Sequence, residues 1–114
     1  MKALITCSGL SNTGRLTTQV AMTLKSRSAA SIAWAQAHKG EHAIADAVDD
    51  ADQIIVIEGC SDHCASKKLE IMGIMLDFHI VATELGVEKD GLADVKWCDV
   101  ETVIAAFDRK ITGV

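Results

Sequence analysis

The chain has 114 residues, a length that fits one folded domain. Hydrophobic residues make up 49% of it and charged residues 24%, a balance that argues against intrinsic disorder. Its net charge of -5 disfavours general nucleic-acid binding, because an acidic surface repels the phosphate backbone. No apolar run is long enough to span a membrane, and no signal peptide is recognisable. We therefore expect a cytoplasmic protein with a single domain over residues 1–114.

The beginning of the chain predicts a strand, a polar loop and a helix. Residues 3–6 form a short apolar run, and residues 8–14 contain two glycines and several small polar residues that mark a loop. From Arg15 to Arg27, apolar residues recur at every fourth position, which is typical of a helix with one apolar stripe. Ser11 or Asn12 is suited to cap this helix.

Strands and helices alternate in the rest of the chain. Four consecutive β-branched residues within Gln53–Ile57 predict a central strand that is buried on both faces. The other expected elements are a weak strand over residues 31–34, a helix over 41–51, a helix over 64–72, a strand over 78–82, a loop-like stretch over 83–96 and a last helix with Asp99 as its N-cap. This order predicts a three-layer α/β fold, flavodoxin-like or Rossmann-like, with helices on both faces of a parallel sheet.

Three of the four cysteines are expected to meet at the carboxyl edge of this sheet. Cys7 ends the first strand, Cys60 follows the central strand, and Cys64 lies on the first turn of the next helix. The ends of neighbouring strands lie about 5 Å apart, and helix N-termini at this edge favour thiolates. In a reducing cytosol, four cysteines favour metal binding or catalysis over disulfides.

Clustered thiolates repel one another unless a cation lies among them. Zinc takes sulfur and nitrogen ligands in tetrahedral geometry, whereas magnesium and calcium prefer oxygen. We therefore expect Zn²⁺ bound by Cys7, Cys60 and Cys64, with glycines 9 and 59 allowing the backbone to bend nearby. The alternative is that these cysteines are small buried hydrophobic residues.

Two segments resemble a known family. Residues 58–70, Glu-Gly-Cys-Ser-Asp-His-Cys-Ala-Ser-Lys-Lys-Leu-Glu, resemble the motif that names the DGC family, Asp-Gly-Cys followed by a second cysteine and Ala-Lys-Lys-x-Leu-Glu. Residues 7–14 resemble its opening, Cys-Ser-Gly-Gly-Ser-Asn-x-Gly, and residues 79–87 resemble its late strand and loop. The family is described as zinc-binding through four cysteines, with a poorly defined biochemical role.

The sequence departs from the family pattern at two positions. Glu58 replaces the aspartate, and Ser31 stands where we match a further family cysteine. A serine hydroxyl is a poor zinc ligand, so the fourth ligand is open. Cys98, beside the start of the last helix, is our first choice, and the alternatives are His63, His38 or water. A position filled by water would permit catalysis at the metal.

Two other sites are compatible with the opening motif. Residues 9–16 approach the phosphate-binding loop G-x-x-x-x-G-K-[ST], but Arg15 replaces its lysine and Leu16 its hydroxyl. Cys7 followed by Arg15 approaches a cysteine-dependent phosphatase signature, with a longer gap than that chemistry uses. We regard both as weaker than zinc binding.

The main rival to a metal site is a thiol redox or sulfur-transfer enzyme. Cys60 and Cys64, or Cys7, would be its reactive residues, because a cysteine near a helix start has a lowered pKa and reacts readily. The sequence names no substrate or protein partner. It also leaves the oligomeric state open, a homodimer included.

Overall fold

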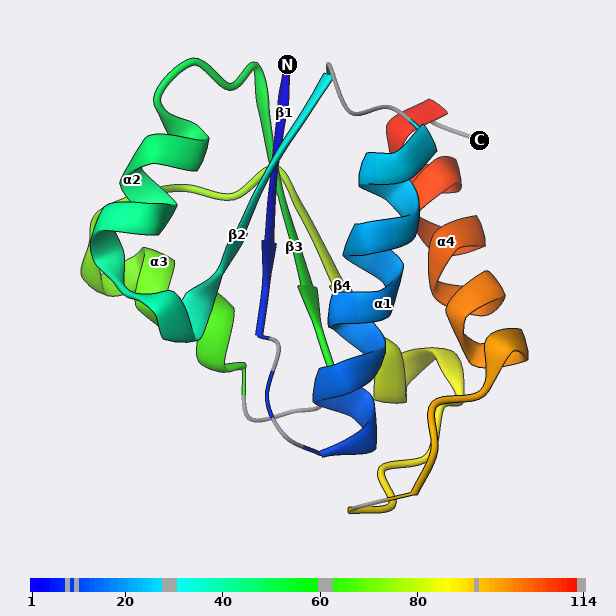
Figure 1. The fold of residues 1–114 in the computed structure, drawn as a ribbon. Helices are drawn as coiled ribbons and strands as arrows, with labels where there is room; N and C mark the ends of the chain where they lie inside the picture. The colour runs from blue at the N-terminus through cyan, green and yellow to red at the C-terminus, as the bar shows by residue number, and fades with distance from the viewer. Residues whose placement is uncertain (8, 10, 28–30, 60–62, 92, 113–114) are drawn as a thin grey trace.

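The computed structural model describes residues 1–7, 9, 11–27, 31–59, 63–91 and 93–112. In this part of the chain, four parallel strands form one sheet in the order β2-β1-β3-β4 (Figure 1). The strands are β1 (Lys2–Thr6), β2 (Ile32–Gln36), β3 (Gln53–Glu58) and β4 (Phe78–Val81). The α-helices are α1 (Asn12–Arg27), α2 (Glu41–Val48), α3 (Cys64–Ile71) and α4 (Trp97–Thr112), and the 3-10 helices are η2 (Ala37–Lys39) and η3 (Ala82–Leu85).

Helices cover both faces of the sheet, with α1 and α4 on one side and α2 and α3 on the other (Figure 1). This confirms the three-layer α/β prediction. The strand order is that of flavodoxin-like folds through their first four strands. In such sheets the chain order reverses between β1 and β3, and ligands bind outside the carboxyl ends of these two strands.

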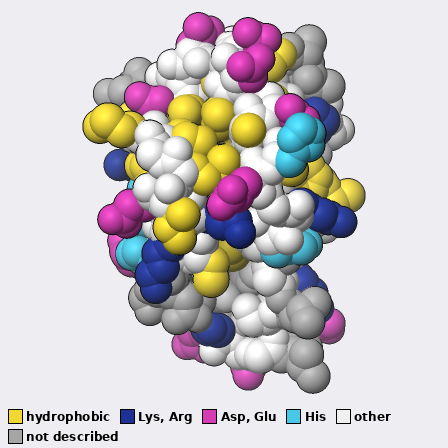
Figure 2. Space-filling model, turned by 90° about the vertical axis from the view of Figure 1, so that its left-hand side faces the viewer, with side chains coloured by type: hydrophobic (Ala, Val, Ile, Leu, Met, Phe, Trp, Pro, Cys, Tyr) yellow, Lys and Arg dark blue, Asp and Glu magenta, His cyan; other side chains and the backbone are white. Residues whose placement is uncertain are grey.

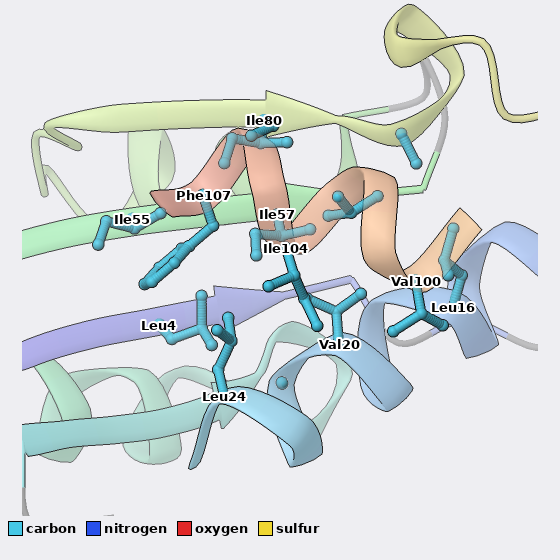
Figure 3. Packing of buried hydrophobic residues seen from close by; sticks show 14 of the residues in the cluster. Leu4, Leu16, Val20, Leu24, Ile55, Ile57, Ile80, Val100, Ile104 and Phe107 are labelled. Atoms are coloured by element: carbon cyan, nitrogen blue, oxygen red, sulfur yellow. The ribbon is translucent and has the colours of Figure 1, made fainter. Parts of the chain in front are cut away.

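The larger part of the core lies between the sheet and the helices α1 and α4 (Figure 3). It is mainly aliphatic, as expected for a chain without tyrosine and with only two phenylalanines. The side chains that meet there include Leu4, Leu16, Val20, Leu24, Ile55, Ile57, Ile80, Val100, Ile104 and Phe107.

A smaller apolar cluster joins the opposite face of the sheet to α2 and α3. Ile5 and Val56 from the sheet pack with Ile44 of α2 and Leu69 of α3. Hydrophobic side chains also reach the surface on this side of the molecule (Figure 2). Because successive strand residues point to opposite faces, Glu58, two residues after Val56, also points toward α3.

The loop after η3 is fastened to the start of α1, which begins at Asn12 rather than at Arg15. The hydroxyl of Ser11 accepts a hydrogen bond from the Gly14 amide at 3.3 Å, so Ser11 caps the helix as expected. The side chain of Asn12 donates to the Glu88 carbonyl and accepts from the Asp90 amide, both at 2.7 Å. These bonds hold a segment that lies more than seventy residues away in the sequence.

The ends of β2, α2, α3 and β4 differ from the sequence prediction by one to three residues, and two assignments differ in kind. The stretch over residues 83–96 is not entirely loop, because η3 continues directly from β4 and ends at Leu85. Gly86 follows as its C-cap, with a φ of 95° that suits glycine. The prediction of Asp99 as the N-cap of the last helix was wrong. The carbonyl of Lys96 accepts bonds from the amides of Asp99 and Val100, so Asp99 lies inside the first turn. There its carboxylate still faces the positive end of the helix dipole.

Within the described residues, no helix combines the length and the apolar character needed to cross a lipid bilayer.

Candidate metal centre

Cys7 lies where β1 and β3 end side by side. Its amide donates to the Ile57 carbonyl at 3.4 Å, which extends the pairing of the two strands by one residue. Its half-buried sulfur accepts a hydrogen bond from the Gly59 amide at 3.3 Å and lies 3.7 Å from the hydroxyl oxygen of Thr17. The thiol is therefore turned toward the backbone of the residue that precedes Cys60. Cys60 itself lies outside the described residues.

Gly59 allows the end of β3 to touch the start of α1. A Cβ atom on Gly59 would lie 2.6 Å from the carbonyl carbon of Thr13, and a Cβ atom on Gly14 would lie 2.6 Å from backbone atoms of Gly9. Both separations are too short for any side chain. We expected glycines 9 and 59 to let the backbone bend. The chain does bend at Gly59, and the missing side chain also permits this close packing.

The other two predicted cysteine ligands lie on opposite faces of the sheet. Cys64 is the first residue of α3 and is exposed, on the face toward which Glu58 points. Cys98 is also exposed, but it lies in the first turn of α4, which packs with α1 on the other face. Cys7 packs against the cluster of α2 and α3. Cys98 and Cys64 therefore lie on opposite sides of the sheet, and Cys7, whose sulfur also lies near Thr17 of α1, is at the edge between them. Among the described residues, these three cysteines are not grouped closely enough to share a metal ion.

Ser31 and His38 lie at opposite ends of β2. Ser31 directly precedes β2, at the amino edge of the sheet. Cys7 lies at the carboxyl edge, and a five-residue strand places the two edges about 17 Å apart. A ligand at position 31 would be remote from Cys7, so matching Ser31 to a family cysteine does not locate the fourth ligand. His38 follows β2 at the carboxyl edge, in η2, which packs against α3.

Glu58 is a buried carboxylate at the same edge, with 1% of its surface exposed. Its Oε1 accepts hydrogen bonds from the amides of Ala65 at 2.7 Å and Ser66 at 3.3 Å. Its Oε2 accepts the hydroxyl of Ser66 at 3.1 Å and contacts Nε2 of His79 through a short hydrogen bond. Glu58 thus caps the N-terminus of α3, although it belongs to β3 and not to the helix itself. Its carboxylate lies at the positive end of the helix dipole.

Two histidines adjoin this carboxylate. Phe78 and Ile80 pack into the core on the α1 and α4 side, so His79 between them faces α3. The rings of His63 and His79 meet edge to face, with centroids 5.0 Å apart. Each residue of the set Glu58, His63 and His79 has a ligand atom within 4.8 Å of those of the others. Over the described ranges, these are the side chains grouped closely enough to hold a metal ion.

The sequence predicts His63 only as one possible fourth ligand, and His79 is not among the predicted ligands. No local motif connects Glu58 with His79, because they lie on different strands and 21 positions apart. The signal that was available is alternation along two neighbouring strands. Glu58 follows a buried strand, and His79 stands between two apolar residues, which placed both polar side chains on one face.

The start of α1 is not arranged to hold a phosphate group. The Gly14 amide is taken by Ser11, the Asn12 amide donates to Gly91, and the guanidinium of Arg15 donates to the Ala93 carbonyl. Half of the residues that line a hollow of about 290 Å³ beside Asn12 are acidic, against one lysine, and acidic side chains repel anions. The residues that line it are Asn12, Gly86, Glu88, Asp90, Ala93, Asp94, Lys96 and Asp99. The phosphate-loop and phosphatase interpretations therefore gain no support here.

The family model for the DGC domain matches residues 3–107 of the chain. The chain belongs to the DGC domain family. Curated proteins and solved structures gave no significant match. Family membership is consistent with a small metal-binding protein, and the matched range of the DGC domain includes Cys7, Cys60, Cys64 and the Glu58 cluster.

The donors at the carboxyl edge of this DGC domain suit a transition metal. Thiol sulfur and imidazole nitrogen are the ligands that zinc prefers, and a carboxylate is its usual oxygen ligand. Magnesium and calcium take six or more oxygen ligands, and Glu58 is the one carboxylate of the described cluster. The arrangement can therefore bind a cation of the zinc type or present a reactive thiol.

Proposed function

We propose that this DGC domain binds Zn²⁺ through Cys7, Cys60 and Cys64 at the carboxyl edge of the sheet. The observation that carries the proposal is the 3.3 Å hydrogen bond from the Gly59 amide to the sulfur of Cys7. This hydrogen bond joins Cys7, at the end of β1, to Gly59, the residue before Cys60, although the two residues lie more than fifty positions apart in the sequence. This contact lies where ligands bind in flavodoxin-like sheets, at the reversal between β1 and β3.

Two physical effects support thiolate ligands at this edge. Cys64 is the first residue of α3, and the partial positive charge at a helix start stabilises a deprotonated thiol. The Gly59 amide donates to the sulfur of Cys7 and so fixes the direction of this sulfur at the ends of β1 and β3. Cys98 is left out of this ligand set because its helix covers the other face. His63, His38 and a solvent molecule remain as donors for the fourth position.

Elemental analysis of the purified protein tests this function. We expect Cys7→Ser, Cys60→Ser and Cys64→Ser each to lose one equivalent of zinc per chain relative to the unmodified protein. Cys98→Ser is the matched control and should keep its zinc, because Cys98 lies on α4. Unchanged zinc content in Cys60→Ser would remove the cysteines from the site. Loss of zinc in Cys98→Ser alone would show that the ligand set is wrong.

A thiol redox or sulfur-transfer enzyme is the second function that an observation favours. Cys64 is exposed at the start of a helix, where thiols are reactive nucleophiles. Purified protein without metal, in which Cys64 is alkylated much faster than Cys98, would favour this enzyme over the zinc-binding function. Both cysteines are exposed, so their comparison separates reactivity from access.

A further inference from the structure

The two oxygens of the Glu58 carboxylate face different partners. Oε1 is fixed by the amides of Ala65 and Ser66, which belong to the first turn of α3. Oε2 faces away from these amides, toward the hydroxyl of Ser66 and the ring of His79. A carboxylate anchored through one oxygen presents the other in a fixed direction, as a metal ligand requires. Its 1% exposure shows that the anchored charge is withdrawn from solvent.

His79 presents its ring to this oxygen while remaining open to solvent. It lies on the edge strand β4, and 26% of its side-chain surface is exposed, against 1% for Glu58. A cation can therefore approach the cluster from the side of the histidines. The buried carboxylate supplies the negative charge at the inner end.

His63 occupies a costly backbone conformation beside His79. Its φ is 54°, and among the described residues it is the one non-glycine residue with a positive φ. This conformation costs on the order of 1 kcal/mol, and such residues are concentrated at functional sites. His63 is the N-cap residue of α3, yet its side chain makes no capping hydrogen bond, since Glu58 caps the helix instead. The imidazole is thus directed to His79 and not to the helix.

We propose that Glu58, His63 and His79 form a metal site of their own for a divalent transition cation such as Zn²⁺. Two imidazoles and one carboxylate are the protein ligands of many zinc sites that keep an open position, and also of non-haem iron sites. The cation takes the place now bridged by the hydrogen bond between His79 and Glu58. Ser66 and the amides of α3 orient the carboxylate from behind.

This site is separate from the cysteine site proposed above. Cys7, Glu58 and His79 lie on the three successive strands β1, β3 and β4, and neighbouring strands are about 5 Å apart. Cys7 is level with Glu58, whereas His79 is level with Val56, two residues earlier. The backbones of Cys7 and His79 are therefore about 12 Å apart, with β3 between them. Nε2 of His79 is directed at Glu58, while the sulfur of Cys7 is directed at Gly59. The inference therefore does not depend on the cysteines binding zinc.

Cobalt titration of a variant without the three cysteine ligands tests the proposal. We expect Cys7→Ser/Cys60→Ser/Cys64→Ser to bind one equivalent of Co²⁺, with visible d–d absorption and no sulfur-to-cobalt charge-transfer band. In that background, His79→Gln should weaken Co²⁺ binding by about 100-fold or more, since even supporting residues account for 10–100-fold. The amide of glutamine can still donate a hydrogen bond to Glu58. This variant therefore removes the imidazole and leaves the carboxylate with a hydrogen-bond donor.

Two further variants control the comparison. His63→Asn should also weaken Co²⁺ binding, and asparagine tolerates the left-handed backbone conformation at this position. His42→Ala should leave binding unchanged, because His42 is almost fully exposed on α2 and pairs with Asp46. A folded triple-cysteine variant that takes up no Co²⁺ would overturn the proposal. Equal losses in His42→Ala and His79→Gln would overturn it as well.

A second measurement uses the unmodified protein, in case the triple variant does not fold. With ¹⁵N-labelled histidine, addition of Zn²⁺ should shift the imidazole nitrogen signals of His63 and His79, and those of His42 should stay in place. Unshifted signals at both His63 and His79 would overturn the site. The cysteine site is judged separately by the sulfur-to-cobalt band in the unmodified protein, and its absence leaves the Glu58 site intact.

Discussion

Gly59 and Thr13 approach each other more closely than any side chain at position 59 would permit. A Cβ atom on Gly59 would lie 2.6 Å from the carbonyl carbon of Thr13 and 2.8 Å from its Cβ. Thr13 is fully buried in the first turn of α1. The end of β3 is therefore pressed against the start of α1, and the Gly59 amide is held where it meets the sulfur of Cys7.

This contact predicts that Gly59→Ala destabilises the protein. The added methyl group would meet backbone atoms, which cannot rotate away, so we expect a loss of about 1–3 kcal/mol in the free energy of unfolding. Urea denaturation followed by circular dichroism measures it. Gly9→Ala is the matched control, because a Cβ atom there would meet nothing within 4 Å, and its effect should stay within about 0.5 kcal/mol. Equal stability of the two variants would contradict the close approach.

Glu58→Ala should be strongly destabilising even without metal. It would leave the amides of Ala65 and Ser66 without their acceptor and His79 without its partner. We expect a loss of about 1–3 kcal/mol, typical of leaving buried hydrogen-bonding groups without their partner. Guanidinium unfolding in the presence of a chelator measures this loss without a metal contribution. Glu70→Ala, an exposed acid on the same helix, should change stability little, and a similar loss there would refute the capping role of Glu58.

The sequence was sufficient to predict the layered fold and most of its elements. The four apolar β-branched residues of the central strand and the fourfold spacing in α1 are local signals. Both elements are present, although α1 begins three residues earlier than predicted. The start of α4 was missed because aspartate is favourable both as an N-cap and within the first turn. Only the backbone bonds to Lys96 distinguish these two positions of Asp99.

The candidate site was partly predictable for a similar reason. The approach of Cys7 to the residue before Cys60 followed from two parallel strands that end at one edge. The pairing of Glu58 with His79 did not follow, because it depends on the register of β4 against β3, and no residue pattern sets that register. The separation of Cys98 depends on which face α4 covers, which one sequence does not reveal.

The Asn12 side chain should control how tightly the loop after η3 is held. Asn12→Ala removes the bonds to the Glu88 carbonyl and the Asp90 amide, and we expect a loss of about 1–3 kcal/mol because the site is buried. Hydrogen exchange should show faster exchange at the Asp90 amide. Gln19→Ala, exposed on the same helix, should leave exchange at Asp90 unchanged. Unaltered exchange in Asn12→Ala would mean that the loop is held by other contacts.

Zinc should protect one exposed cysteine from alkylation and leave the other reactive. Cys64 and Cys98 are both exposed near a helix start, so without metal both should react with iodoacetamide. If Cys64 binds zinc and Cys98 does not, saturating Zn²⁺ should slow the labelling of Cys64 by about tenfold or more, because a bound thiolate is a poorer nucleophile.

Peptide mass spectrometry resolves the two labelling rates within one sample, so Cys98 serves as an internal control for protein folding and reagent activity. Cys7→Ser should abolish the protection of Cys64, because the proposed ion needs sulfur ligands from both strand ends. Protection that persists in Cys7→Ser would show that Cys64 binds zinc without Cys7. Equal labelling of Cys64 with and without zinc would instead favour a reactive thiol at the start of α3.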